Sequence, residues 1–312
     1  MEKIAIVGAG LVGRAWAMVF ARAGHPVALH DVNPAVLEPA LAAIESSLAD
    51  LHASGLITEA PATVRQRIAA TARLDEAVSG AAHVQENVLE NVEAKKGVFA
   101  ALDACAPKGA VLASSTSGIP ASSFTEALPG RARCLVAHPI NPPSLVPLVE
   151  LVPAPWTDPA VVARTRALLA RVGQVPIAVR RELKGFIVNR LQGALLHEAF
   201  SLVEKGFVSA DDLDKAIKDG LGLRWSFMGP FETIDLNAPG GVADYCARYG
   251  PLYHEITKES EPRPWSDALV NQVAAERLAL LPADQRPARQ GWRDRRLMGL
   301  VSHKRAAAKR DG

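Results

Sequence analysis

The chain has 312 residues, and its 35 basic and 33 acidic side chains leave a formal net charge of +2. Such a length predicts two domains, and so balanced a charge does not favour nucleic acid as a partner. No apolar run approaches the roughly 18 residues of a membrane helix, and the N-terminal residues do not read as a secretory signal. Three cysteines without CxxC spacing argue against disulfides and a zinc site. We therefore expect a soluble cytoplasmic protein without a metal.

The first half of the chain alternates short apolar runs with stretches of helical period, which is the pattern of βαβ units around a parallel sheet. The expected strands are "KIAIVG", "PVALHD", "HVQENV", "AVLASS", "RCLVAHP", "LVELV" and "VPIAVR". The expected helices include residues 11–24, 34–54, 92–106 and 158–171. The sequence thus predicts an α/β fold, with a doubly wound Rossmann domain and a mostly parallel sheet over residues 1–182.

The pattern changes after "KGFIVNRL", where apolar residues follow mixed three- and four-residue spacing and no strand-like run appears afterwards. Ser209 precedes "ADDLDK" and is placed to cap a helix. The C-terminal "WRDRRLMGLVSHKRAAAKR" suits one helix with a solvated cationic face. Residues 183–312 are therefore predicted to form an all-helical second domain.

A glycine-rich turn follows the first predicted strand, with Gly8, Gly10 and Gly13 in GxGxxG spacing. The apolar strand before it and the amphipathic helix after it are the context of a dinucleotide-binding turn. Gly8 permits the tight turn, Gly10 lets the backbone approach a pyrophosphate, and Gly13 allows close packing of helix on sheet. The helix N-terminus, with Leu11 and Val12, would face the anion. We expect this turn to bind the cofactor.

Asp31 ends the second predicted strand and indicates which dinucleotide binds. A carboxylate accepts hydrogen bonds from both ribose hydroxyls, whereas a 2′-phosphate at the same place would bring like charges together. No arginine stands beside Asp31 to receive a phosphate, because Val32 and Asn33 follow it. NAD is therefore favoured over NADP.

One histidine lies where open α/β sheets place their ligands, in "VAHPINPPSLVPLVE". His138 ends a predicted strand, and Pro139, Pro142 and Pro143 stiffen the segment after it. Oxidation of an alcohol by a nicotinamide needs a base for the hydroxyl proton, and Glu150 in the next strand could orient the imidazole. A histidine in a loop is more often structural, so these residues alone leave both interpretations of His138 open.

Four motifs around the glycine turn resemble the L-3-hydroxyacyl-CoA dehydrogenase superfamily: "VLEN" (88–91), "SSTSGI" (114–119), "HPINPPSLVPLVELV" and "GFIVNR" (185–190). The resemblance implies that His138 is the catalytic base and Glu150 its partner. It also implies that Ser117 and Asn189 are catalytic groups, which hold the 3-oxygen of the substrate and the imidazole. Helix capping by Ser117, and burial of Asn189 against backbone, are the structural alternatives.

The same resemblance places three residues near the nicotinamide as cofactor-binding groups, namely Glu90, Lys95 and Ser117. For Glu90 and Lys95 the alternative is a solvated surface pair. A non-catalytic NAD-binding structural protein would need a broken site. All the expected catalytic residues are present, which argues against that role.

The substrate is narrowed by similarity to a subgroup of the superfamily, lambda-crystallin, whose family activity is L-gulonate 3-dehydrogenase. "GLGLRWSFMGPFETIDLNAPGG" and "WRDRRLM" carry this similarity, and L-carnitine dehydrogenase shares "GLRW" and "MGPF" stretches. The resemblance implies oxidation of a small L-3-hydroxy acid to the 3-keto acid, with L-gulonate favoured. The alternatives are L-carnitine and an L-3-hydroxyacyl-CoA such as 3-hydroxybutyryl-CoA.

The connection between the second and third predicted strands bears on the thioester alternative. Superfamily members that act on coenzyme A thioesters bind the coenzyme with lysines there. This chain has no lysine between Lys3 and Lys95 and offers only Arg65, Arg67 and Arg73. The absence of lysine argues against a thioester substrate, but it does not exclude one, because arginine also binds phosphate.

Arg224, in "GLRW", is a candidate for binding the substrate carboxylate, for a subunit contact or for a helix-end ion pair. Trp225, Phe227, Met228 and Phe231 follow it and could line a substrate pocket, but in an all-helical domain they are rather expected in the core or in a dimer interface. The superfamily is dimeric through its helical domain. We therefore expect a homodimer formed through residues 183–312.

Overall fold

The computed structural model describes residues 1–261 and 263–311, which form two compact units. Unit 1 contains residues 1–190 together with the chain from Asp294 onward, and unit 2 contains Leu191–Arg293. The division of the structure differs in two respects from the single boundary expected after residue 182. Residues 183–190 stay with unit 1 because Phe186 is buried in its core. The last helix also belongs to unit 1 from Asp294 onward, since Met298 joins the core there.

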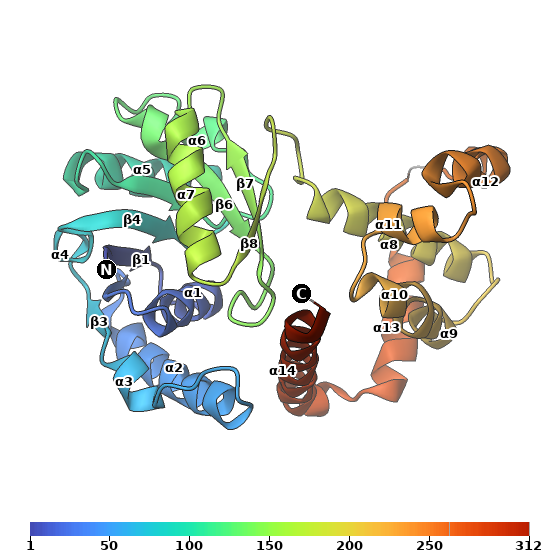
Figure 1. Ribbon diagram of the computed structural model, residues 1–312, viewed down its shortest axis with the longest axis horizontal. Coiled ribbons are helices and arrows are strands. Elements are labelled where there is room, and N and C mark those ends of the chain that lie inside the picture. The colour runs from blue at the N-terminus through green and yellow to red at the C-terminus, as the bar shows by residue number, and fades with distance from the viewer. Residues whose placement is uncertain (262, 312) are drawn as a thin grey trace. The chain divides into compact units, whose positions relative to one another are not determined.

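Unit 1 is built on one sheet, whose strands within the described residues follow the order β3-β2-β1-β4-β5-β6-β7-β8 (Figure 1). Neighbouring strands of this described sheet run parallel, except β6 and β7, which are antiparallel. The α/β class and the mostly parallel sheet are thereby confirmed. The bounds are β1 Lys3–Val7, β2 Val27–His30, β3 Ile68–Thr71, β4 Ala81–Glu86, β5 Val111–Ser114, β6 Cys134–Pro139, β7 Leu148–Pro153 and β8 Val175–Ala178.

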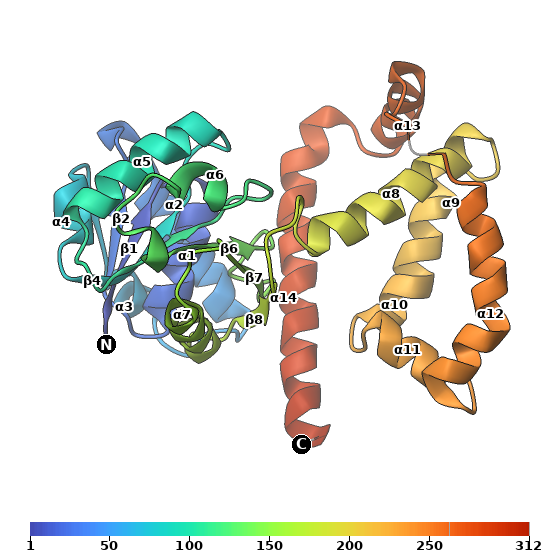
Figure 2. The same ribbon diagram turned by 90° about the horizontal axis from the view of Figure 1, so that it is seen from above.

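Helices cover both faces of the sheet, as two separate clusters of buried side chains require (Figure 2). In β1, Ile4 and Ile6 point into one cluster and Ala5 and Val7 into the other, because side chains alternate along a strand. The main helices of unit 1 are α1 Leu11–Arg22, α2 Leu37–Ala53, α3 Pro61–Arg65, α4 Leu74–Val78, α5 Val92–Cys105, α6 Ser122–Thr125 and α7 Pro159–Arg171.

Unit 2 is helical, as expected for the second half of the chain. Ser209 caps its helix by accepting a hydrogen bond from Asp212 N at 3.1 Å. The bounds are α8 Val188–Glu204, which begins in unit 1, α9 Ala210–Lys215, a π-helical segment Ala216–Leu221, α10 Gly222–Trp225, α11 Pro230–Leu236, α12 Gly241–Lys258 and α13 Asp267–Leu280. Across the described residues, no helix has the length and apolar character needed to span a bilayer.

The last helix, α14 (Arg286–Asp311), begins in unit 2 and continues into unit 1. Its inward face carries Met298, which is 8% exposed, with Leu297 and Val301 packed against the same cluster. Arg305 adds a hydrogen bond from Nη1 to Leu56 O at 3.0 Å. The C-terminal basic segment is thus a helix, as predicted, and its apolar residues tie it to the core of unit 1.

Candidate active site

The glycine turn has the geometry that a dinucleotide requires. Gly8 has φ +98°, and a Cβ built there would lie 2.6 Å from Asn87 O. A Cβ on Gly13 would lie 1.8 Å from Gly8 O, so only glycine lets α1 approach β1 this closely. A Cβ on Gly10 meets no described atom within 4 Å. The backbone at the start of α1 is therefore open at Gly10, with Leu11 80% exposed beside it and Val12 packed towards the core.

Asp31 fixes the end of β2 to this turn. Its Oδ2 accepts a hydrogen bond from Ala9 N at 2.9 Å, and its Oδ1 accepts one from Asn33 N at 3.0 Å. A carboxylate has about four lone-pair positions, so capacity remains for two hydroxyl donors. A cavity of about 330 Å³ adjoins it, lined by Gly8, Asp31 and mostly apolar residues that include Leu74 and Val98. The open turn, the acid and this cavity together fit an adenine dinucleotide.

His138 and Glu150 face each other across the two antiparallel strands. They are direct partners in the β6–β7 register, and His138 Nδ1 donates to Glu150 Oε2 at 2.8 Å. The imidazole is 5% exposed and the carboxylate is fully buried. Among the residues that the structure describes, Nε2 of His138 has no hydrogen-bond partner. An ionised carboxylate only accepts, so Nδ1 carries the proton and Nε2 keeps its lone pair.

Glu150 is held on its other oxygen by main-chain groups. Its Oε1 accepts hydrogen bonds from Ile187 N at 2.7 Å and Val188 N at 3.1 Å. Burial alone would raise the pKa of this carboxyl. The hydrogen bonds from His138, Ile187 and Val188 outweigh burial and leave the pKa of Glu150 below its ordinary value. Glu150 is therefore ionised at neutral pH.

The two amides reach Glu150 because the chain turns sharply where α8 begins. Gly185 and Phe186 both have positive φ, of 76° and 50°, and for a phenylalanine this conformation is strained. The Phe186 ring is fully buried, and its centroid lies 5.5 Å from that of His138. One residue thus packs against the imidazole while its backbone places the donors that hold the carboxylate.

Ser117 and Asn189 lie beside each other. Asn189 Nδ2 donates to Ser117 O at 2.5 Å, and both residues are exposed. Helix α6 begins at Ser122, with Ala121 at its N-cap, so Ser117 caps no helix there. Asn189 follows Val188, whose amide binds Glu150. The four residues that the sequence analysis grouped as catalytic are therefore linked through α8, by Asn189 to Ser117 and by Val188 to Glu150.

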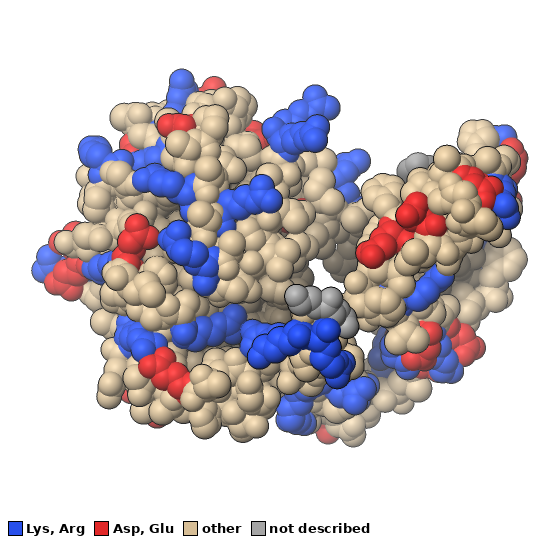
Figure 3. All heavy atoms as spheres, viewed as in Figure 1, with Lys and Arg blue, Asp and Glu red and all other residues tan. Residues whose placement is uncertain are grey.

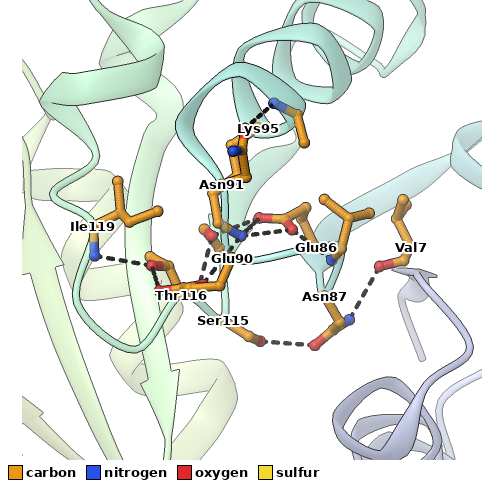
Figure 4. A network of polar contacts seen from close by, with 12 residues as sticks. Val7, Glu86, Asn87, Glu90, Asn91, Lys95, Ser115, Thr116 and Ile119 are labelled. Carbon is orange, nitrogen blue, oxygen red and sulfur yellow. Dashed lines mark hydrogen bonds and ion pairs between the residues drawn. The ribbon is translucent and has the colours of Figure 1, made fainter.

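Glu90 holds the turn that contains Ser117. Its Oε1 accepts hydrogen bonds from Thr116 Oγ1 at 2.6 Å, Ser117 N at 2.9 Å and Gly118 N at 3.2 Å (Figure 4). Its Oε2 lies 3.7 Å from Lys95 Nζ. This carboxylate accordingly fixes the backbone of Ser117 rather than standing alone at the surface.

Lys95 is buried, with 1% of its surface exposed, so the solvated surface pair that we considered is wrong. Its ammonium group donates to both oxygens of the fully buried Glu86, at 3.0 and 3.1 Å. Glu86 also accepts from Ser114 Oγ at 2.5 Å and from Val88 N at 2.6 Å. Lys95 therefore lies within ion-pair distance of two carboxylates, those of Glu86 and Glu90 (Figure 4).

Several polar residues of this network were not singled out from the sequence. Ser115 Oγ donates to Asn87 Oδ1 at 2.8 Å, and Asn87 Nδ2 donates to Val7 O at 3.3 Å (Figure 4). Trp16 Nε1 donates to Ser115 Oγ at 3.1 Å. These bonds join α1 to the ends of β1, β4 and β5. The sequence signal that could have identified them is the polar residues at the ends of two predicted strands, "HVQENV" and "AVLASS".

Arg224 lies in α10 of unit 2 and is exposed. The aromatic residues after it are also exposed, Trp225 by 41%, Phe227 by 69% and Phe231 by 77%. These aromatic side chains are thus not in the core of unit 2, which was one of the expected places.

The chain is similar to known dehydrogenases over most of its length. Residues 3–183 match the 3-hydroxyacyl-CoA dehydrogenase NAD binding domain, and residues 185–279 match the C-terminal domain of the same family. A lambda-crystallin homolog of Bos taurus is 45% identical over 306 residues, covering 96% of this chain and 95% of that protein. L-carnitine dehydrogenase of Streptomyces griseus is 38% identical over 276 residues, covering 88% of this chain and 82% of that protein.

Among solved structures, the NAD⁺-dependent 5-formyl-3-hydroxy-2-methylpyridine 4-carboxylic acid 5-dehydrogenase is similar over 98% of both chains, with a TM-score of 0.84 and 28% identity. The match to an NAD binding domain agrees with the geometry of the glycine turn. The chain therefore belongs to the 3-hydroxyacyl-CoA dehydrogenase family of NAD-dependent oxidoreductases.

Proposed function

We propose that the protein oxidises the 3-hydroxyl group of a small L-3-hydroxy acid to the 3-keto acid, with His138 as the catalytic base. The observation that carries this proposal is the buried pair of His138 and Glu150, which leaves Nε2 as the proton acceptor. Glu150 is ionised and held by two main-chain amides, so it can stabilise the imidazolium without moving.

The proton path follows from the tautomer. Nε2 of His138 takes the hydroxyl proton of the substrate, and the imidazolium that forms keeps its hydrogen bond from Nδ1 to Glu150. When bound, NAD supplies a nicotinamide ring that accepts the hydride from C3 of the substrate. In the reducing direction the imidazolium returns the proton to the 3-oxygen. Positioned acid–base catalysis of this kind contributes about 10² to 10⁴ in rate.

Ser117 and Asn189 are proposed to bind the 3-oxygen. Their side chains are exposed, and the contact from Asn189 Nδ2 to Ser117 O keeps the two residues together. Glu90 fixes the Ser117 amide, and Lys95 fixes Glu90, so these two act on the site by positioning Ser117. This differs from the direct cofactor contact first expected of Lys95, because its ammonium group is already held by Glu86.

The cofactor would be held by the glycine turn and Asp31. Gly10 leaves the backbone at the start of α1, including Leu11 and Val12, open to a pyrophosphate. Asp31 keeps acceptor capacity for the two ribose hydroxyls, and a 2′-phosphate would meet its negative charge. We therefore propose NAD rather than NADP as the working cofactor.

L-Gulonate is the substrate that we favour. Two observations support it: the match to the lambda-crystallin homolog extends over 96% of the chain, and the connection between β2 and β3 has no lysine for a coenzyme. Arg224 is the cation that we propose for the substrate carboxylate. L-Carnitine is the second candidate, since the chain is 38% identical to an L-carnitine dehydrogenase.

A substrate panel tests this choice directly. NADH formation is followed with L-gulonate, L-carnitine and L-3-hydroxybutyryl-CoA under one set of conditions. We expect kcat/KM to be highest with L-gulonate. A higher value with the thioester would overturn the substrate assignment while leaving His138 as the base, and no turnover of any 3-hydroxy compound would point to a structural protein.

A further inference from the structure

A second cavity, of about 750 Å³, lies in unit 1 and shares no residue with the cavity beside Asp31. Its walls come from the end of α1, from the connection between α2 and α3, and from α14. The polar side chains that line it are Arg22, Thr58, Glu59, Ser302, Arg305 and Lys309. We refer to it as the α14 cavity. It contains none of the residues proposed for catalysis or for binding NAD.

The side chains that line the α14 cavity carry a net positive charge. Glu59 is its acidic residue, and both of its oxygens are bound by Arg67, at 2.6 and 2.5 Å. Among the side chains that the structure describes, which end at Arg310, no carboxylate lies at ion-pair distance from Arg22, Arg305 or Lys309. Basic side chains accordingly gather around the C-terminal end of α14 (Figure 3).

The environment of Arg22 disfavours its positive charge. Arg22 is half-buried, and its Nη1 donates to Ser144 O at 2.8 Å. Burial, and next the charge of Arg305, lower the pKa of Arg22 to about 10. Arg305 is itself held at the cavity by its bond to Leu56 O. Two fixed guanidinium groups that repel each other are stabilised by an anion that contacts both.

We propose that the α14 cavity is a binding site for a phosphate group. Arginine presents a planar fork of donors that matches phosphate oxygens, and Arg22 and Arg305 provide two such forks. Lys309 adds a third positive charge, while Thr58 and Ser302 offer hydroxyl donors. A dianion suits three cations better than a monoanion does. The volume also admits the organic part of a phosphorylated metabolite, so either free phosphate or a phosphate ester is the ligand.

The site depends on a helix that lies outside the two matched family domains, which end at residue 279. Ser302, Arg305 and Lys309 all belong to α14. The proposal therefore does not follow from the dehydrogenase reaction and does not depend on which hydroxy acid is oxidised. Its failure would leave the proposed function untouched.

Isothermal titration calorimetry tests the site on the full chain saturated with NAD, so that the glycine turn is not free to bind phosphate. Inorganic phosphate and glucose 6-phosphate are titrated separately, at constant ionic strength. We expect saturable binding of at least one of them. Tighter binding of inorganic phosphate would identify the free ion as the ligand, and tighter binding of the sugar phosphate would identify an ester; either result supports the site.

Two variants locate the binding. The double variant Arg305→Gln with Lys309→Gln should weaken binding about tenfold or more, because it removes two of the three cations. Lys304→Gln, at an exposed position of the same helix outside the cavity, should bind like the wild type. Absence of binding to the wild type would overturn the proposal. So would equal weakening by Lys304→Gln, or unchanged affinity of a double variant that still turns over substrate.

Discussion

The tautomer of His138 depends on one contact, the hydrogen bond from Nδ1 to Glu150. Glu150 in turn has its second oxygen bound by Ile187 N and Val188 N. A buried carboxylate without such donors would tend to take up a proton, and the imidazole would then lose its negatively charged partner. At this scale, the site consists of a base whose tautomer is set by a carboxylate, and of a carboxylate whose charge is set by main-chain amides.

The charge of Glu150 predicts how stability depends on pH. In the folded protein the pKa of the Glu150 carboxyl lies below its ordinary value of 4.5. The ionised carboxylate therefore stabilises the fold at pH values above 4.5. That contribution is lost as the pH falls through the lowered pKa of the folded state. Glu150→Gln should therefore unfold at lower urea concentration than the wild type at pH 7, and the difference should shrink on acidification.

Urea unfolding of both proteins at pH 7 and at about pH 4, near the ordinary carboxyl pKa, measures this difference. Glu126→Gln, at an exposed glutamate of unit 1, serves as the control and should match the wild type at both pH values. A difference between Glu150→Gln and the wild type that grows on acidification would contradict the assigned charge.

At the level of elements, the site depends on three junctions: the β6–β7 register, the start of α8 and the turn after β5. The sequence predicted both β6 and β7 and placed Glu150 beside His138, because a short connection joins two apolar runs. The turn at Phe186 could not be predicted from the sequence. Glycine is the residue that signals a positive φ, and here a phenylalanine adopts one. The pairing of Lys95 with Glu86 was also missed, because it links a helix to a strand end.

The left-handed turn at Phe186 gives a second prediction. Phe186→Ala and Phe186→Gly both remove the buried ring, at a cost of about 3 to 5 kcal/mol in unfolding free energy. Glycine adopts φ of 50° without strain, so the Gly variant should be about 1 kcal/mol more stable than the Ala variant.

Phe99 provides the matched control, since it is fully buried within helix α5. There the order should reverse, with the Gly variant about 1 kcal/mol less stable than the Ala variant. Thermal or urea unfolding of the four variants measures both orders. The same order of stability between the Ala and Gly variants at Phe186 and at Phe99 would contradict the backbone strain assigned to Phe186.

At the scale of the whole molecule, less could be predicted from the sequence than at the scale of the elements. Apolar spacing predicted that the C-terminal segment is a helix, but not that its inward face packs on unit 1 through Met298. The spacing of apolar residues identifies which face of a helix is apolar, but it does not identify the part of the protein on which that face packs. The strand β3 (Ile68–Thr71) was missed because "IAAT" is short and rich in alanine, which is depleted in strands.

The oligomeric state is the prediction that belongs to this scale. Unit 2 exposes large apolar side chains, among them Phe227, Phe231, Leu236 and Leu252, which range from 54% to 77% exposed. Exposed apolar surface of this kind marks an interface. We expect light scattering to give twice the mass of one chain, and Phe227→Asp with Phe231→Asp to shift the protein towards the monomer. A monomeric wild type at micromolar concentration would contradict the homodimer.

The central claim is that His138 is the base, and turnover of His138→Gln tests it most directly. Glutamine fills much of the same space but cannot accept the proton, so kcat should fall by about 10² to 10⁴ while NAD still binds. His52→Gln, at an exposed histidine near the end of α2, is the control and should keep wild-type turnover. A His138→Gln protein that binds NAD and retains more than about a tenth of the wild-type kcat would contradict the mechanism.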